Sequence, residues 1–192
     1  MDRLSLNLVR VGQAIRALML REARDTHLTP VQIQTLLFVR HTKSFATSIS
    51  RLALQLGASH ASTVGVVDGL VAHNYLERSP SSKDRRVTLL RLTPQGEEVC
   101  GRLGGWRRPL DELVDQLSSE DRQHLERGLA ELLTRFERAG IAPAGAPCDG
   151  CRHFARAEAG EADLPYYCTL LQEGISATEA TKDCPEFSPS VA

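Results

Sequence analysis

The last 45 residues of this 192-residue chain hold four of its five cysteines, and this restricts how that segment can fold. The four are Cys148, Cys151, Cys168 and Cys184, with the spacing C-x2-C-x16-C-x15-C and few aliphatic side chains among them. Hydrophobic burial alone does not hold so short a segment, which generally needs a metal or disulfides. We therefore expect four thiolates to converge on one metal centre that stabilises a small domain.

Zinc and an iron–sulfur cluster place different demands on this spacing. Structural zinc ribbons usually present two C-x2-4-C pairs, and only Cys148 and Cys151 form such a pair here. A 4Fe–4S cluster has four corners around a larger centre and accepts single ligands from long loops. Cys184 is followed by Pro185, as in many iron–sulfur ligand runs. The sequence favours a 4Fe–4S cluster and leaves zinc as the alternative.

Other residues of the tail and the fifth cysteine have simpler interpretations. Four aromatic residues lie near the ligands and are expected to screen a cluster from water: Phe154, Tyr166, Tyr167 and Phe187. His153 is predicted to be a surface histidine, with ligation or donation to a cluster sulfur as the alternative. Cys100, alone in a helical stretch, is predicted to be a small buried apolar residue rather than a redox-sensing thiol.

No segment suggests secretion or membrane insertion. Residues 1–5 do not begin a basic stretch followed by an apolar one, and no apolar run approaches the roughly 20 residues of a membrane span. We therefore expect a cytoplasmic protein without membrane contact. Clustered cysteines in that reducing compartment are more often metal ligands than disulfides.

The formal net charge of −1 taken alone argues against a nucleic-acid binder. The charges are unevenly placed, however: residues 1–140 carry 20 Lys and Arg against 16 Asp and Glu, and residues 141–192 carry 3 against 8. An uncharged stretch of small residues with two prolines, residues 139–147, separates the two parts. We predict two domains, 1–140 and 141–192.

The first part is predicted to be mainly helical, with one β-hairpin. Expected helices run from Leu4 to about Arg24, from Pro30 after a Thr29 cap, from Ser48 to Leu56 before Gly57, from the Ser59 cap to about His73, from Thr93 with a bend at Gly104–Gly105, and from Ser118 to near Arg138. Residues 76–92 alternate around a polar, basic turn and predict the hairpin. Its tip holds Lys83, Arg85 and Arg86.

A helix, a short turn, a second helix and a basic hairpin in this order predict a winged helix-turn-helix. In such a domain the second helix enters the major groove of DNA and the hairpin reaches the neighbouring minor groove. Residues 40–91 carry eight basic residues, including Arg40, Lys43, Arg51 and Arg78, against three acidic ones, which suits phosphate contact.

From about Leu28 to Arg138 the chain resembles the MarR family of bacterial transcriptional regulators. The resemblance is carried by Asp84-Arg85-Arg86 followed by Arg91-Leu92-Thr93-Pro94-Gln95-Gly96, by Gly57-Ala58-Ser59 and by Tyr75-Leu76-Glu77-Arg78. It implies a homodimer that packs through its first and last helices and binds a pseudo-palindromic operator in double-stranded DNA. Arg86 would enter the minor groove, and Asp84 would orient the wing through an ion pair.

The DNA-facing side of the second helix is predicted from its apolar stripe. Val64, Val67, Leu70 and Val71 would face the core, which leaves Ser59, His60, Ser62 and Thr63 toward DNA. Gly69 stands where the family often carries a basic residue, so direct base contacts are expected to be few.

The tail pattern C-x2-C-x2-F, then C, then C-P-x-F resembles the small cluster-binding domains that accompany some glycyl-radical enzymes. Those domains bind 4Fe–4S clusters in a fold like that of the high-potential iron proteins. The resemblance therefore implies the same cofactor here.

Three functions follow from these observations. The first is a dimeric DNA-binding regulator whose cluster senses redox state, oxygen, nitric oxide or iron. The second is a MarR-like regulator that responds to a small organic effector and has a purely structural zinc site. The third is an electron-transfer accessory protein. No catalytic constellation stands out from the scattered Ser, His and Asp residues, so we expect a protein that is not an enzyme.

Overall fold

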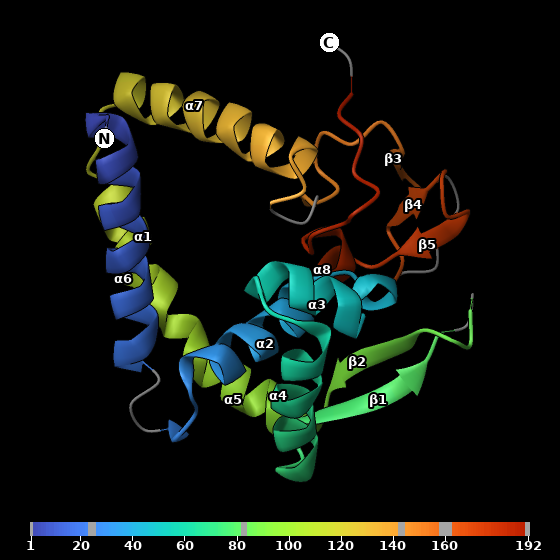
Figure 1. Cartoon of the computed structure of the whole chain (residues 1–192). Coiled ribbons are helices and arrows are strands. Elements are labelled where there is room, and N and C mark those ends of the chain that lie inside the picture. The colour runs from blue at the N-terminus through green and yellow to red at the C-terminus, as the bar shows by residue number, and fades with distance from the viewer. Residues whose placement is uncertain (1, 23–25, 82–83, 142–144, 158–162, 191–192) are drawn as a thin grey trace.

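The computed structural model describes residues 2–22, 26–81, 84–141, 145–157 and 163–190. In chain order the elements are α1 (Arg3–Glu22), α2 (Pro30–His41), η2 (Ser44–Ala46), α3 (Ile49–Leu56), α4 (His60–Ala72), β1 (Leu76–Pro80), β2 (Thr88–Leu92), α5 (Pro94–Leu103), η3 (Gly104–Trp106), α6 (Arg107–Val114), α7 (Ser119–Arg138), β3 (Phe154–Arg156), β4 (Tyr166–Cys168), β5 (Glu173–Ile175) and α8 (Ala177–Ala180). Strands β1 and β2 form an antiparallel hairpin, and β3, β4 and β5 form a separate antiparallel sheet (Figure 1).

Local signals in the sequence set most helix ends, as predicted. Thr29 and Gln32 form a capping box at the start of α2, where Pro30 needs no hydrogen-bond acceptor. Four further hydroxyl caps begin helices: Ser48 at α3, Ser59 at α4, Thr93 at α5 and Ser118 at α7. Gly57 ends α3 with φ 59° and Asn74 follows α4 with φ 56°, both left-handed. Arg24, the predicted end of the first helix, lies outside the described residues.

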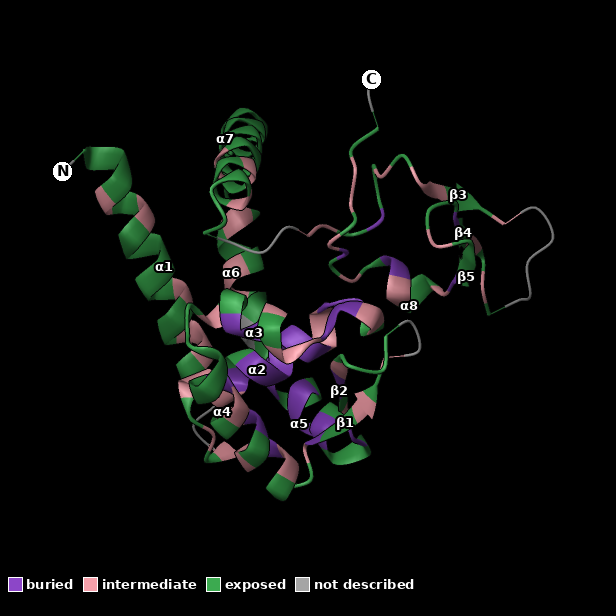
Figure 2. Cartoon of the chain, turned by 45° about the vertical axis from the view of Figure 1, so that its right-hand side comes forward, coloured by how far each residue is buried: buried purple, intermediate pink, exposed green. Residues whose placement is uncertain are grey.

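The core of the winged helix lies between α2, α4, α5 and the hairpin, where Figure 2 shows buried residues concentrated on α2 and α5. The predicted core face of α2 is confirmed, because Ile33, Leu36, Leu37 and Val39 are buried, and Phe38 is buried beside them. Each fully buried aliphatic side chain contributes about 1.5–3 kcal/mol. The glycine pair that was predicted to bend one long helix instead forms η3, which separates α5 from α6.

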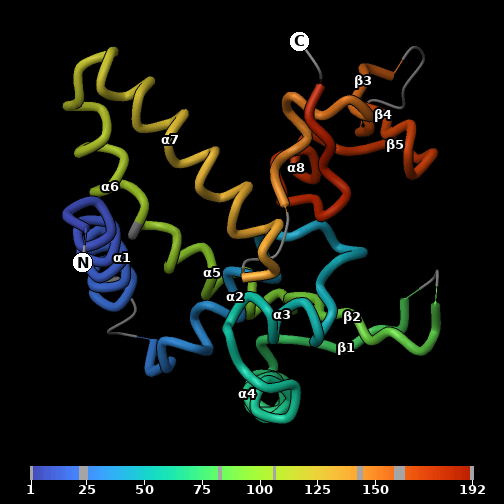
Figure 3. The backbone as a smooth tube through the Cα atoms, turned by 45° about the horizontal axis from the view of Figure 1, so that its top comes forward, coloured from blue at the N-terminus to red at the C-terminus, as the bar shows by residue number. Residues whose placement is uncertain are grey.

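Three helices extend from this core and keep apolar side chains exposed. α1 lies beside α6, and α7 runs from the far end of this pair back toward the C-terminal segment (Figures 1 and 3). Neither α6 nor α7 has a buried residue among those described. Two of these helices, α1 and α7, are called the arms below, and both expose apolar residues: Leu4 and Val11 on α1, and Leu125, Leu129, Leu133 and Phe136 on α7. Among the described residues, no helix is long and apolar enough to cross a membrane.

The C-terminal segment, residues 145–190, has its own small core. Cys148, Cys168, Ile175 and Ala180 are buried together, and Phe154, Tyr166 and Leu171 pack against them. The segment joins the winged helix at the end of α2, where Thr42 and Asp183 form a parallel bridge. Figure 3 shows α8 beside the junction between α2 and α3.

Candidate functional site

The second helix of the helix-turn-helix, α4, has an inner face made by Thr63, Val67 and Leu70, each fully buried. The prediction that Thr63 faces DNA was therefore wrong. Its Oγ1 donates to the main-chain oxygen of Ser59 at 2.9 Å, which satisfies the hydroxyl and lets the residue lie inside. Val64, predicted to face the core, is only half-buried.

The outer face of α4 carries small and polar side chains. Ser59, His60 and Ser62 are exposed at its N-terminus, where they were predicted. Ser59 Oγ accepts a hydrogen bond from Ser62 N at 3.1 Å, so its hydroxyl caps the helix. Further along this helix Asp68 is paired with Arg78 of β1 at 2.8 Å, which offsets a carboxylate that would repel phosphate.

The wing projects from the core with its arginines exposed. Arg85 and Arg86 lie at the tip, and both are exposed to solvent. Lys83, also predicted to contact DNA, lies outside the described residues. Asp84 Oδ1 accepts from the main-chain N–H of Arg86 at 2.9 Å, so the carboxylate shapes the turn that presents this arginine. The ion pair expected for Asp84 stays a prediction.

Three other basic residues of the stretch 40–91 lie against other parts of the chain. Arg40 pairs with Glu97 at 3.6 Å. Lys43 is only 3% exposed and donates to the main-chain oxygen of Glu179, so its assignment to phosphate contact was wrong. Arg51 is half-exposed and lines a small cavity with Asp183 and Pro185 of the C-terminal segment. Within residues 40–91, the exposed positive charge is therefore concentrated at the wing.

All four tail cysteines line a single cavity. Cys148, Cys168 and Cys184 are at most 9% exposed, Cys151 is half-exposed, and all four are free thiols. The other walls include Phe154 and Phe187, and the space left between the side chains is narrow, about 20 Å³. Four thiols from three separate stretches of chain thus face one space.

Main-chain hydrogen bonds hold these cysteines in place. Cys151 N donates to Cys148 O at 3.0 Å across a turn in which Gly150 has φ 73°. Cys168 lies in β4, and Cys184 N donates to Ala146 O at 2.9 Å. Burial raises the pKa of the Cys184 thiol, whereas the main-chain N–H of Glu186 lowers it, and the nearby Cys148 raises it again.

The cysteine side chains around this cavity are not arranged to coordinate a single metal ion. Among the described residues, no group of three or more His, Cys, Asp or Glu side chains has the arrangement of a metal-ion site. His153 is half-buried and lines the cavity, with its Nδ1 3.4 Å from Thr169 Oγ1, so the surface histidine and the ligation alternative both stay predictions. Phe154 packs against Tyr166 with 4.8 Å between ring centroids, whereas Tyr167, also expected to screen the ligands, is exposed.

Cys100 is separate from this group. It is fully buried in the core of the winged helix, and burial raises the pKa of its thiol to about 11. A thiol with so high a pKa is almost entirely protonated at neutral pH and is a poor nucleophile. The structure agrees with the prediction of a small buried apolar residue.

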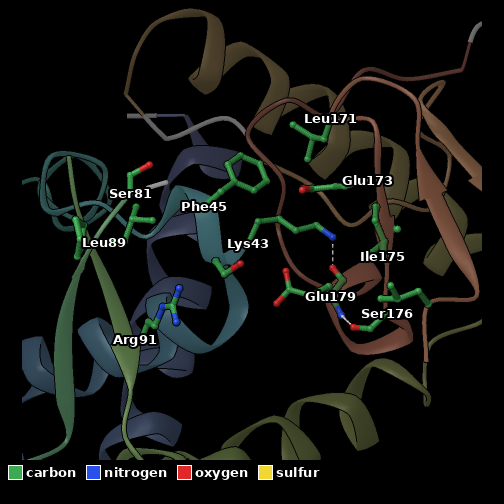
Figure 4. Close-up of a pocket in the computed structure, with 14 residues that line it drawn as sticks. Lys43, Phe45, Ser81, Leu89, Arg91, Leu171, Glu173, Ile175, Ser176 and Glu179 are labelled. Carbon is green, nitrogen blue, oxygen red and sulfur yellow. Dashed lines mark hydrogen bonds between the residues drawn. The ribbon is translucent and has the colours of Figure 1, made fainter. Parts of the chain in front are cut away.

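Two larger cavities border the junction between the winged helix and the C-terminal segment. One is lined by Lys43, Phe45 and the wing residue Arg91 on one side and by Glu173 and Glu179 on the other (Figure 4). The other lies between α1, α2 and α6.

That second cavity is lined by Met19, Phe38, His41 and Arg107, and its volume is about 360 Å³. Burial lowers the pKa of His41, and the positive charge of Arg107 lowers it further.

Sequence comparisons agree with the winged helix. A family model of the MarR family matches residues 28–87. The uncharacterized HTH-type transcriptional regulator YfiV of Bacillus subtilis is 30% identical over 92 residues, which are 47% of this chain and 58% of YfiV. The corresponding regulator YhbI of the same organism is 34% identical over 67 residues, 35% of this chain and 44% of YhbI. The chain thus spans about half the length of these curated relatives.

Solved structures share the fold over a larger part of the chain. The transcriptional repressor CouR of Rhodococcus jostii, bound to a 23-mer DNA duplex, is 25% identical with a TM-score of 0.53 over 68% of this chain and 92% of CouR. Apo MarR of Escherichia coli is 23% identical with a TM-score of 0.53 over 69% of this chain and 98% of that one. These likenesses show that the chain shares the winged-helix fold of these structures.

Proposed function

We propose that this protein is a homodimeric, DNA-binding transcriptional regulator of the MarR type. The observation that carries the proposal is the exposed outer face of α4 beside a wing whose Arg85 and Arg86 are both exposed. A helix of this kind fits the major groove, and an arginine-tipped wing fits the minor groove, whose negative potential attracts guanidinium groups. The winged-helix likeness to CouR, which was solved on a DNA duplex, supports the same use here.

The partner of the exposed apolar arms is a second copy of this chain. On α7, Leu125, Leu129 and Leu133 recur every four residues, so they form one stripe along the helix. Large contiguous apolar patches are rare on monomers and mark interfaces. Two copies joined through such arms would present two winged helices, which matches a pseudo-palindromic operator.

Salt dependence tests the DNA-binding proposal without knowledge of the operator. A duplex selected from a random-sequence pool by the wild-type protein serves as the probe. The plot of log K against log salt has a slope of roughly −0.9 for each phosphate neutralised. Replacing Arg86 with Ala should weaken binding several-fold, while Arg135→Ala, which removes an exposed arginine paired with Glu131 on α7, should not. Equal affinities of the wild type and Arg86→Ala would refute the assignment of the wing.

For the C-terminal segment, we propose that Cys148, Cys151, Cys168 and Cys184 hold a 4Fe–4S cluster whose state changes DNA affinity. Support comes from the four free thiols that line one cavity and from the aromatic side chains at its wall. The thiols come from three separate stretches of chain with only one C-x2-C pair, an arrangement that suits the four corners of a cluster better than the two close pairs of a zinc ribbon. When bound, the cluster would supply a redox-active, oxygen-sensitive centre. The protein's part is to provide four thiolates and a largely apolar shell.

Metal analysis of anaerobically purified protein tests the second proposal. We expect a brown protein with broad absorption near roughly 400 nm and iron and sulfide in equal amounts, as four-cysteine cubane clusters have. Cys148→Ser should abolish this absorption and leave the helical circular dichroism of the winged helix intact. Cys100→Ser is the matched control, because this thiol lies in the other core and should leave the absorption unchanged.

A second candidate function is a regulator with a structural zinc site and an organic effector. The cavity between α1, α2 and α6 favours it, because an aromatic residue, Phe38, and a cationic residue, Arg107, both line it. CouR has been solved with p-coumaroyl-CoA, an aromatic thioester. A colourless protein with one zinc per chain would select this candidate. An electron-transfer protein would instead show the cluster and no salt-dependent DNA binding.

A further inference from the structure

Lys43 is a buried lysine in an unexpected place. It follows the end of α2 by two residues and is 3% exposed. Its Nζ donates to the main-chain oxygen of Glu179, at the end of α8 (Figure 4). In the part of the chain that the structure describes, its ammonium makes no ion pair. Burying an ammonium is costly, so its retention at this junction calls for a role beyond packing.

Main-chain hydrogen bonds join the same two segments. Asp183 N donates to His41 O at 2.7 Å, and Lys43 N donates to Asp183 O at 3.0 Å. Asp183 precedes Cys184 and is therefore rigidly linked to one of the four cavity cysteines. A second link is Cys148 N, which donates to Ala180 O at 2.9 Å, next to the oxygen that Lys43 contacts. The segment that contacts residues 41–43, residues 179–183, is thus linked through its backbone to two of the cavity cysteines.

The other side of Lys43 is joined to the DNA-binding elements. Thr47 is 1% exposed, and its Oγ1 lies 2.8 Å from Leu90 O in wing strand β2. Leu90 N in turn donates to Thr47 O at 3.0 Å. Ser48 pairs with Leu89 of the same strand and caps α3. Residues 41–48 therefore form a short junction between the cysteine cavity and the helix-turn-helix with its wing.

We propose that this junction, residues 41–48, transmits the state of the cysteine centre to the DNA-binding surface, and that Lys43 is the positioning residue that holds it closed. The proposal deepens and rests on the proposed function. When the centre is lost, the four thiols lose their common partner and the backbone around Cys184 is free to shift. Asp183 then moves relative to His41, and the displacement reaches α3 and β2 through Thr47. The segments move together because Lys43 ties the C-terminal end of α8 to them.

The test uses Lys43→Met in the full chain with its metal centre. Methionine keeps a long apolar side chain and removes the ammonium donors. The matched control is Lys182→Met, which removes a neighbouring lysine that pairs with the Glu179 side chain at 2.6 Å outside the junction. Two quantities are measured: hydrogen exchange at the amides of Lys43 and Asp183, and the ratio of affinities for the selected duplex before and after chelation of the metal.

We expect Lys43→Met to keep the metal content and the helical signal of the wild type. Exchange at the Lys43 and Asp183 amides should rise at least about tenfold, and the ratio of affinities should fall to near one. Lys182→Met should match the wild type in both. If these amides exchange in Lys43→Met as slowly as in the wild type, the proposal is overturned. Faster exchange with an unchanged ratio of DNA affinities would also overturn it.

Two further results separate this proposal from the proposed function. Chelation of the wild-type protein should itself speed exchange across residues 41–48, and unchanged exchange would refute the junction even if the two forms differ in DNA affinity. Failure of the wild type to bind any duplex would instead refute DNA binding, while the exchange data still decide the junction. If Lys43→Met does not fold, Thr47→Val tests the other side: we expect it to leave Asp183 protected and to reduce the ratio of affinities.

Discussion

Gly96 should tolerate no side chain, because α5 begins against the corner between α4 and β1. A Cβ added at Gly96 would lie 2.1 Å from the main-chain oxygen of Tyr75. The closest ordinary C···O contacts are about 3.3 Å, so the two segments would have to separate by about 1.2 Å. Such overpacking costs about 1–3 kcal/mol. The same oxygen accepts a hydrogen bond from Thr93 N at 3.1 Å, worth about 1 kcal/mol more if lost.

We therefore expect Gly96→Ala to lower the free energy of unfolding by about 1–3 kcal/mol, after the better helix propensity of alanine, about 1 kcal/mol, offsets part of the loss. Gly101→Ala, in the same helix, is the matched control. Nothing lies within 4 Å of a Cβ added there, so it should stabilise the protein by about 0.5–1 kcal/mol. Urea unfolding followed by circular dichroism at one protein concentration measures both. Equal effects of the two substitutions would refute the close contact at Tyr75.

Three further predictions follow from other parts of the molecule. Thr63→Ala should lower the free energy of unfolding by about 1 kcal/mol, because Thr63 is buried. Ser62→Ala, at an exposed position, should weaken duplex binding and leave the free energy of unfolding unchanged. The reverse pattern would show that Thr63, and not Ser62, contacts DNA. Leu129→Glu, in the exposed stripe of α7, should give monomers in sedimentation velocity, and a persisting dimer would exclude this stripe. Burial lowers the pKa of His41 in the folded protein below its ordinary value of 6.5, so the unfolded chain binds more protons than the folded one as the pH falls. The stability that His41 contributes above pH 6.5 should therefore be lost as the pH drops toward the folded pKa. His41→Gln should reduce that loss in urea unfolding, and an unchanged pH dependence would rule out His41 as its source.

Local signals in the sequence predicted the helices of the winged helix well. Hydroxyl caps at Thr29 and Ser59 and the left-handed residue Gly57 act within a few residues of themselves, so a single sequence reveals them. The buried face of α4 was harder to predict, because the valines of this helix lie on several of its sides and form no single apolar stripe. Thr63 turned inward because it could satisfy its own hydroxyl on the preceding turn.

Long-range contacts could not be read from the sequence. Lys43 looked like one more basic residue near the DNA surface, and its partner oxygen on Glu179 lies 136 residues further along the chain. The four cysteines were the exception, since their spacing alone indicated a common centre and the structure places all four on one cavity. The chemistry of that centre depends on what binds the thiols, which spacing and folding do not determine.

The most direct test of the central claim is the affinity of one duplex for the same protein preparation with and without its metal centre. A regulator controlled by this centre should show a difference of about 5–150-fold, the usual range for coupled sites. Iron and sulfide contents measured on the two samples confirm that only the centre has changed. Equal affinities of the two forms would contradict control of DNA binding by the cysteine centre.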